Sequence, residues 1–214
     1  MSAQVWAIVV AAGAGQRFGQ LKQFAPLGGS TVAAHSVAGC RSCAHGVVLV
    51  VPADHVERAD FGADIVVAGG ATRSESVRCG LAAVPEDAEV IVVHDAARPL
   101  AGAHLFGAVV EAITNGVAPA AICATEVFDT IKVVDPARRV TATLDRSTLV
   151  AVQTPQAFEA QVLRRAHGGR GEATDDAALV ERIGATVVVI PGDTANFKIT
   201  TTTDLRAAER ALEG

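Results

Sequence analysis

Residues 5–19 read VWAIVVAAGAGQRFG, a short apolar run that passes directly into a loop of small residues. An unbroken apolar run of this length is typical of a strand buried on both faces, as in a parallel sheet covered by helices. Glycine after a first strand allows backbone N–H groups to approach a ligand, which is usually a phosphate. The stretch therefore predicts the opening strand of a wound α/β fold and a phosphate-binding loop at its carboxyl end.

The same alternation of apolar runs and helical patterns continues along the chain. Short runs rich in Val and Ile predict further buried strands at 47–51, 65–67, 90–93, 120–124 and 187–190. Helical patterns lie between and after them at 32–43, 74–84, 104–114, 177–184 and 203–213. Strands that alternate with helices predict an α/β protein with a wound, mostly parallel sheet. We expect residues 1–214 to form a single domain.

One segment departs from this pattern. From Glu126 to Arg146 apolar and polar residues alternate on either side of the turn sequence Asp135-Pro136-Ala137-Arg138-Arg139, so we predict a β-hairpin. A lone hairpin is only marginally stable in water, so an arm at 126–148 is expected to pack against another surface. The sequence leaves open whether that surface belongs to the same domain or to another subunit.

Composition narrows the functional class. The 214 residues are 50% hydrophobic and 19% charged, which supplies a sizeable core and excludes a disordered chain. A formal net charge of −5 argues against a protein that coats nucleic acid, which needs a basic face. No apolar run reaches the roughly 18 residues that cross a bilayer, and no basic flank precedes the first run. We therefore expect a cytoplasmic protein with no membrane and no nucleic-acid partner.

The cysteines allow a redox or zinc-binding interpretation. Cys40 and Cys43 form a C-x-x-C pair with His45 just after it. A thioredoxin-like pair stands at the start of a helix, whereas this one falls at the end of a helical pattern. A zinc site needs about two further ligands, and the chain has no second C-x-x-C. We expect reduced structural thiols and no protein ligand set for a metal.

The glycine loop after the first strand is open to three interpretations. A Walker loop requires Gly-Lys followed by Ser or Thr, which is absent. A dinucleotide-binding fingerprint requires an acidic residue near the end of the second strand, where the chain has Val51-Pro52-Ala53. A nucleotidyltransferase loop combines Gly-x-Gly-x-Arg with a nearby Lys, and Arg17 and Lys22 fit that pattern. Two cations at this loop would stabilise the charge that develops on a triphosphate under attack.

Polar stretches follow the later strands as well. They lie at 69–76, 94–99, 129–132, 153–156, 174–176 and 196–200. An Asp at the carboxyl end of a strand, such as Asp95, is a favoured ligand position in a wound sheet. Some stretches also have a structural interpretation, because Thr72 or Ser74 can cap one helix and Thr174 another. The three lysines of the chain fall in these stretches or beside the first loop: Lys22, Lys132 and Lys198.

Taken together, these stretches resemble one family, the 2-C-methyl-D-erythritol 4-phosphate cytidylyltransferases of the non-mevalonate isoprenoid route. The resemblance runs from Val5 to about Leu205. Its motifs are Ala11-Ala12-Gly13-x-Gly15-x-Arg17, Lys22-Gln23, Gly69-Gly70-x-x-Arg73-x-x-Ser76-Val77, the run 94–99, Asp129-Thr130-Ile131-Lys132, Thr154-Pro155-Gln156, Thr174-Asp175-Asp176-Ala177 and Asn196-x-Lys198-Ile199-Thr200. It implies a Rossmann-like nucleotidyltransferase that transfers CMP from CTP to methylerythritol phosphate. The alternatives are a ribitol-5-phosphate cytidylyltransferase, which shares most of these motifs, and a non-catalytic dinucleotide-binding module.

The resemblance also implies a role for each motif residue. Four cations would act in catalysis: Arg17, Lys22, Arg146 and Lys198. The residues expected to bind CTP are Ala11, Ala12, Gly13, Ala14, Gly15, Gln16, Gly70, Ala71, Arg73, Ser76 and Ala96. Those expected around the sugar-alcohol phosphate are Asp95, Arg98, Thr130, Thr154 and Thr174. The resemblance further implies Mg²⁺ held mainly by the CTP phosphates, and a homodimer in which the 126–148 arm carries Arg146 to the partner's site.

Overall fold

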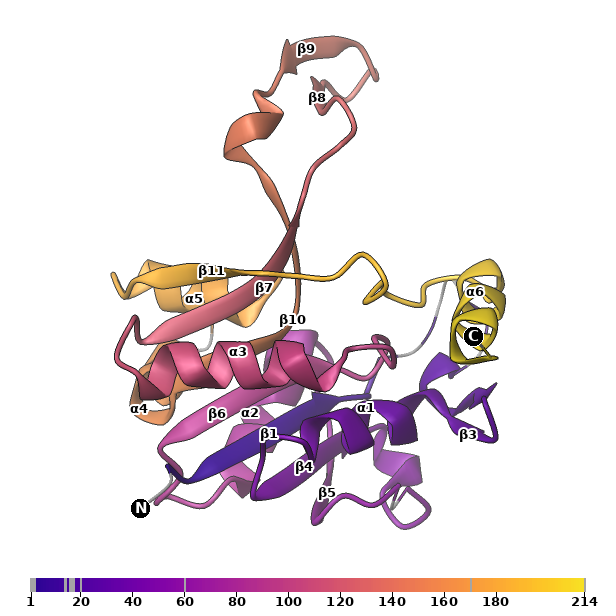
Figure 1. The fold of residues 1–214 in the computed structure, drawn as a ribbon, viewed down its shortest axis with the longest axis vertical. Coiled ribbons are helices and arrows are strands. Elements are labelled where there is room, and N and C mark those ends of the chain that lie inside the picture. Colours follow the sequence, from indigo (N-terminus) through magenta and orange to yellow (C-terminus); the bar gives the residue numbers. More distant parts are fainter. Residues whose placement is uncertain are drawn as a thin grey trace.

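The computed structural model describes residues 3–13, 15, 18–19, 21–59, 61–169 and 171–213. At its centre lies a seven-stranded sheet with the order β11-β7-β10-β6-β1-β4-β5 (Figure 1). Its strands are β1 (Val5–Val10), β4 (Gly46–Val51), β5 (Ile65–Ala68), β6 (Val90–Asp95), β7 (Ala120–Glu126), β10 (Val150–Glu159) and β11 (Val187–Pro191). Neighbouring strands run parallel except for β10, which is antiparallel to both β6 and β7. The predicted wound, mostly parallel sheet is confirmed.

Helices cover both faces of this sheet. They are α1 (Val32–Cys40), α2 (Arg73–Ala83), α3 (Ala103–Thr114), α4 (Ala160–Gly168), α5 (Asp176–Arg182) and α6 (Thr202–Glu213). Side chains of α1 and α3 pack into the core on one face, and those of α2, α4 and α5 into the core on the other. Within the described residues, no helix is both long and apolar enough to cross a membrane.

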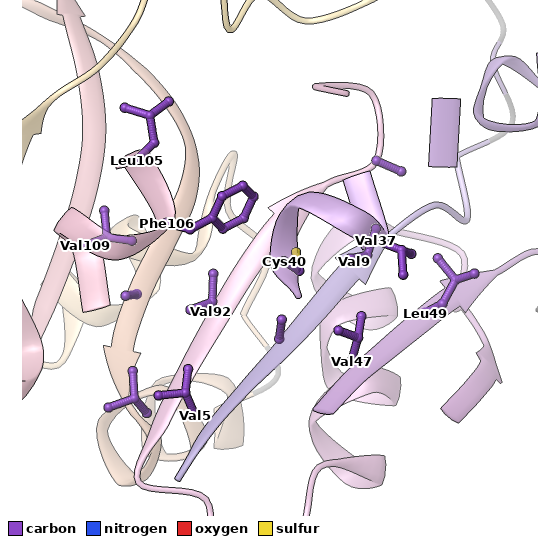
Figure 2. Close-up of a cluster of buried hydrophobic side chains, with 14 of the residues drawn as sticks. Val5, Val9, Val37, Cys40, Val47, Leu49, Val92, Leu105, Phe106 and Val109 are labelled. Atoms are coloured by element: carbon purple, nitrogen blue, oxygen red, sulfur yellow. The ribbon is translucent and has the colours of Figure 1, made fainter. Parts of the chain in front are cut away.

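The continuous apolar runs are explained by this layering. Along β1, Val5 and Val9 point toward α1 and α3, whereas Ile8 points toward α2 on the other face. Figure 2 shows the first of these cores, where Val37 of α1 and Phe106 of α3 lie over the strands. A strand buried on both faces needs an apolar residue at every position, and β1, β4 and β6 meet that requirement almost throughout.

The segment 150–168 holds the largest difference from the prediction, because neither β10 nor α4 is expected from its sequence. Gln153, Thr154 and Pro155 interrupt the apolar pattern of β10, so the sequence does not predict a strand there. The pairing with β7 is irregular here: Val152 lies opposite Ala124, and the next paired residue, Gln156, lies opposite Ile122. A bulge of this kind re-aims side chains that a regular strand would hold in register.

The hairpin arm consists of β8 (Lys132–Val134) and β9 (Val140–Thr143), which pair only with each other among the described strands. Its turn closes through hydrogen bonds between Asp135 and Arg139, and Arg138 adopts a φ of 60°. All seven strand residues are exposed. Figure 1 shows the arm standing away from the sheet on two legs, which are the extensions of β7 and β10.

Shorter elements complete the chain. The 3-10 turns η1 (Lys22–Phe24), η2 (Ala53–His55) and η3 (Arg146–Thr148) accompany a small hairpin, β2 (Pro26–Leu27) with β3 (Ser30–Thr31). Helix α6 packs against β2 at the side of the sheet and forms a third small core there. Two segments far apart in sequence, η1 itself and the stretch before α6, thereby lie at the carboxyl end of β1.

Candidate functional site

Loops at the carboxyl ends of β1, β5 and β6 surround a cavity of about 460 Å³, a size suited to a small-molecule ligand. In a wound sheet this is where ligands usually bind. Most of the residues predicted to bind CTP line it: Ala11, Ala12, Gly13, Gly70, Ala71, Arg73, Ser76 and Ala96. Lys22 and Lys198 line it as well.

Glycine brings the loop after β5 against the loop after β1. A Cβ atom on Gly69 would lie 2.3 Å from the Cβ of Ala12, so only glycine permits this approach. Thr72 caps α2 in a capping box with Glu75, in line with one of the two caps predicted for this helix. The Glu75 carboxylate accepts hydrogen bonds from the backbone N–H groups of Ala71 and Thr72, at 2.7 and 3.1 Å. The loop is therefore held in shape by its own helix.

Lys22 is placed by contacts on either side of it. Its Nζ donates a hydrogen bond to the carbonyl of Ile199 at 2.7 Å. The buried Gln23 donates from Nε2 to the carbonyl of Gly13 at 3.1 Å. The segment after the glycine loop is thus tied to that loop and to the segment that carries Lys198, so both lysines line the same cavity.

A second cavity, of about 390 Å³, shares part of its lining with the first. It holds four of the five residues predicted around the acceptor: Asp95, Arg98, Thr154 and Thr174. The bulge in β10 supplies Thr154 to this cavity, together with Gln153. Thr130, the fifth, is exposed at the base of the arm and is not among the described residues that line either cavity.

Three charged residues line both cavities and form the wall between them: Arg73, Asp95 and Lys198. Asp95, the last residue of β6, accepts hydrogen bonds from Arg73 Nε at 3.1 Å and from Lys198 Nζ at 2.5 Å. Burial would raise the pKa of the Asp95 carboxyl, but the two cations outweigh burial and hold that pKa well below its usual range. Asp95 is therefore an anion at neutral pH.

His94 fixes the hydrogen-bonding role of Thr154 behind this wall. Burial lowers the pKa of His94 to about 4, so its ring is neutral at pH 7. Its Nε2 lies 3.1 Å from the carbonyl of Arg98, which can only accept, so Nε2 carries the proton. Nδ1 is then an acceptor for the Thr154 hydroxyl at 3.1 Å, while that hydroxyl oxygen accepts from the Asp95 N–H at 3.0 Å.

The start of α5 corrects one prediction. Asp175, and not Thr174, caps the helix, since the Asp175 carboxylate accepts from the N–H of Ala178 at 3.1 Å. The second oxygen of Asp175 accepts a hydrogen bond from Gln156 Nε2 at 3.0 Å. Gln156 and Asp175 both line the second cavity without having been predicted to. Only the Thr-Pro-Gln and Thr-Asp-Asp motifs pointed to this part of the chain.

Several predicted site residues lie elsewhere. Ala14, Gln16 and Arg17 fall outside the described residues. Gly15 has a φ of 63° and is not among the described lining residues. Arg146 is exposed at η3, at the base of the arm, where its guanidinium donates to the carbonyl of Phe128. A single chain therefore does not bring Arg146 to either described cavity wall.

The C-x-x-C pair has the surroundings of structural thiols. Cys40 is buried in the core and Cys43 is half-buried beside it, and both are free. Burial raises the pKa of the Cys43 thiol to about 11 and that of Cys40 well above its usual range. Both therefore stay protonated at neutral pH, as expected of inert thiols. Within the described part of the chain, no group of three or more His, Cys, Asp or Glu could hold a metal ion.

Comparison with known proteins shows which family the chain belongs to. The family model described as IspD, 2-C-methyl-D-erythritol 4-phosphate cytidylyltransferase, matches residues 5–214. The chain belongs to the IspD family. The enzyme of that name from Nocardia farcinica is 45% identical over 98% of this chain and 94% of its own length. The one from Rhodococcus jostii is 46% identical over 98% and 95%.

Solved structures of IspD proteins share the fold. The 2-C-methyl-D-erythritol 4-phosphate cytidylyltransferase of Thermus thermophilus superposes with a TM-score of 0.83 at 31% identity, covering 97% of this chain and 98% of its own. The 4-diphosphocytidyl-2C-methyl-D-erythritol synthase of Anaerococcus prevotii gives 0.83 at 29% identity, with 99% of each chain covered. IspD membership makes the chain a nucleotidyltransferase, as predicted, and does not favour the ribitol 5-phosphate alternative.

Proposed function

We propose that this chain transfers CMP from CTP to 2-C-methyl-D-erythritol 4-phosphate, giving 4-diphosphocytidyl-2-C-methyl-D-erythritol and pyrophosphate in isoprenoid precursor biosynthesis. Family membership supports the reaction class. The observation that carries the proposal in the structure is the pair of cavities with a common charged wall. Two anionic substrates that must meet at one phosphorus atom require two adjacent sites with cations at their boundary.

CTP is assigned to the first cavity. The small residues of its loops, such as Gly13 and Gly70, leave room for a nucleotide close to the backbone. Lys22 is proposed to lie near the α-phosphate, and Arg17, five positions earlier in the sequence, to act with it. The chain has only three lysines, and two of them line this cavity, Lys22 and Lys198. An ammonium group is a compact charge with rotatable donors, which suits phosphate oxygens that move during a reaction.

The acceptor is assigned to the second cavity, with its phosphate at Lys198. Arg98, Thr154 and Thr174 line the rest of that cavity and are proposed to hold the sugar alcohol. Because the Thr154 hydroxyl proton is directed to His94, its oxygen offers the cavity a lone pair and suits a hydroxyl of the polyol better than a phosphate oxygen. The charged end of the acceptor then lies at the wall and the polyol end beyond it.

The chemistry needs electrostatic stabilisation more than proton transfer. A phosphate monoester is largely dianionic at pH 7, because its second pKa is near 6, so its oxygen can attack the α-phosphorus without a general base. Repulsion between the two substrates is the main obstacle. Lys22 and Lys198 offset it and stabilise the charge that builds up on the α-phosphoryl oxygens as pyrophosphate leaves.

Mg²⁺ fits this site as an ion carried by the nucleotide. Asp95 is the only carboxylate among the described residues that line the first cavity, and it is already paired with two cations. Mg²⁺ commonly binds through one or two carboxylates and the phosphates of its substrate. We therefore propose that the triphosphate supplies most of the Mg²⁺ ligands, with Asp95 as the carboxylate that the described lining residues offer. When bound, the ion neutralises phosphate charge.

We also propose a homodimer built through the 126–148 arm. Phe128 and Val140 are 69% and 62% exposed, so the described part of the chain leaves most of each residue uncovered. Burying such side chains against a second copy stabilises the pair by roughly 1.5–3 kcal/mol for each fully buried side chain. Arg146 and Thr130, at the base of the arm, would then complete the acceptor site of the partner. A cytoplasmic location is proposed as well, supported by the four free cysteines.

The test is pyrophosphate release by the purified chain with CTP, Mg²⁺ and either 2-C-methyl-D-erythritol 4-phosphate or ribitol 5-phosphate. We expect turnover with the first acceptor and little with the second. Turnover with ribitol 5-phosphate alone would overturn the assigned acceptor. Binding of NADPH without binding of CTP would overturn the reaction class.

A further inference from the structure

Arg73, in the wall between the cavities, is held by two carboxylates. Its Nε donates to Asp95 Oδ1 at 3.1 Å, and its NH1 donates to Asp176 Oδ2 at 2.8 Å. Asp95 lines both cavities, whereas Asp176 is not among the described residues that line either. One contact leaves a long arginine side chain free to turn, and a second fixes the plane of its guanidinium group. The orientation of Arg73 therefore depends on a residue outside the cavities.

Asp176 is itself rigidly placed. It is the first residue of α5, its side chain is 1% exposed, and its second oxygen lies 3.0 Å from Nε2 of the buried His167 of α4. A buried carboxylate is costly unless it is paired, so Arg73 and Asp176 depend on each other. Burial would lower the pKa of Arg73, yet Asp95 and Asp176 together raise that pKa above its usual range.

We propose that Asp176 is a positioning residue for the transfer reaction: it holds Arg73 in the wall, and through Arg73 it keeps Asp95 and Lys198 in place. This inference rests on the proposed function, which puts the meeting point of the two substrates at that wall. The contacts form one continuous chain of alternating charge from Lys198 to Asp95, Arg73 and Asp176. Removing the carboxylate of Asp176, at the buried end, therefore loosens Lys198 at the exposed end.

The alternative is that Asp176 only joins α5 to α2 and α4. The two roles predict different kinetics. A purely structural defect reduces the amount of competent enzyme, which lowers the maximal rate and leaves both KM values unchanged. Loss of positioning raises the KM for CTP and for the acceptor together, because Arg73 lines both cavities.

The experiment is steady-state kinetics of Asp176→Asn with each substrate varied in turn. We expect both KM values to rise about tenfold, as is typical when the group that orients a ligand-binding residue is lost. The matched control is His167→Gln, which alters the contact to the other oxygen of Asp176 and leaves that to Arg73. This control should lower the melting temperature while both KM values stay within about twofold of wild type. Unchanged KM values in Asp176→Asn would overturn the proposal.

A double-variant cycle separates Asp176 from Arg73. Arg73→Gln combined with Asp176→Asn should have the same KM values as Arg73→Gln alone, and independent, additive effects would contradict the proposal. If Asp176→Asn does not fold, Arg73→Met with Asp176→Leu removes both charges together, and its KM values should equal those of Arg73→Met.

The dissociation constant for CTP, measured by calorimetry on the same proteins, tests positioning without turnover. We expect it to rise about tenfold in Asp176→Asn and to stay near wild type in His167→Gln. An inactive wild type with this binding pattern would overturn the proposed reaction and leave the positioning role standing. An active wild type without the pattern would do the reverse.

Discussion

Strand β4 and the arm strands β8 and β9 are built from similar residues and have opposite surroundings. The six residues GVVLVV of β4 are all buried, whereas the seven residues of β8 and β9, also rich in Val, are all exposed. The difference lies in what the rest of the chain places over them, since helices cover β4 and no described element covers the arm (Figure 1). Apolar residues that a chain does not cover itself are typical of an interface.

The largest expected effect contrasts a lysine of the sheet site with a lysine of the arm. Lys22→Ala should reduce kcat by about 10²–10³, because it removes a cation from the charge that develops in the transition state. Lys132→Ala should reduce it by less than about threefold, since within the described residues the Lys132 Nζ donates to Thr143 on the exposed arm. Pyrophosphate release by the two variants, with circular dichroism to check the fold, provides the measurement. Near-normal activity of Lys22→Ala would rule out its assigned role.

The next effect compares stability in the two regions. Phe158 of β10 is fully buried, so Phe158→Ala should lower the free energy of unfolding by about 3–5 kcal/mol at every protein concentration. Val140→Ala on the arm should lower it by less than about 1 kcal/mol in the separated monomer. Urea denaturation at two protein concentrations distinguishes the regions. A large loss for Val140→Ala in dilute monomer would mean that the arm packs on its own chain.

Mixed dimers sharpen the comparison, because they test whether the arm of one chain serves the sheet of another. Arg146→Ala and Lys22→Ala chains should each be inactive. In a heterodimer one of the two sites would receive Lys22 from its own chain and Arg146 from the partner, so random mixing should recover about a quarter of wild-type activity. Recovery is measured after exchange of subunits is confirmed by mass spectrometry. No recovery would argue against a shared site.

The smallest expected effect is the loss of folding stability at acid pH. We expect a buried group of the sheet, and not a group of the arm, to cause it. The pKa of His94 is lowered by burial to about 4, below the value near 6.5 of an unfolded chain. Between these values the unfolded state binds a proton that the folded state does not, so stability is complete above about pH 6.5 and is lost as the pH falls toward 4. Thermal melts of His94→Gln should therefore depend less steeply on pH across this window.

An arm carboxyl supplies the control for that measurement. Hydrogen bonds with Arg139 lower the pKa of Asp135, so this carboxyl titrates below the pH window in which His94 acts. Asp135→Asn should consequently leave the pH dependence of the melting temperature as in wild type. A changed slope in Asp135→Asn with an unchanged one in His94→Gln would reverse the assignment.

The sequence predicts those strands and helices whose residues show a local pattern of apolar and polar positions. Continuous apolar runs located β1, β4 and β6 correctly because both faces of those strands are covered. Strand β10 was not predicted, because its buried residues include Gln153 and Gln156. Their side-chain amide nitrogens donate to Asp193 and Asp175, which lie 40 and 19 residues away in sequence. No local pattern contains such partners.

In the site, too, the sequence predicts local features and misses contacts between distant residues. Motif spacing located the loops at the carboxyl ends of the strands, because topology brings those ends together. It did not predict the ion pair between Arg73 and Asp176, which joins residues 103 positions apart. It also assigned the cap of α5 to Thr174, whereas the structure assigns it to Asp175 and leaves Thr174 to line the second cavity. Composition could not separate these neighbours, since either residue type is a good cap.

Residues 120–159 form one uninterrupted segment that contains β7, the arm and β10 in turn. They supply Ile122, Val152 and Thr154 to the second cavity. The described residues that line the first cavity almost all lie before position 98. Exchange of residues 120–159 between relatives would therefore transfer the arm together with the β7 and β10 side of the second cavity, and would leave the first cavity as it was.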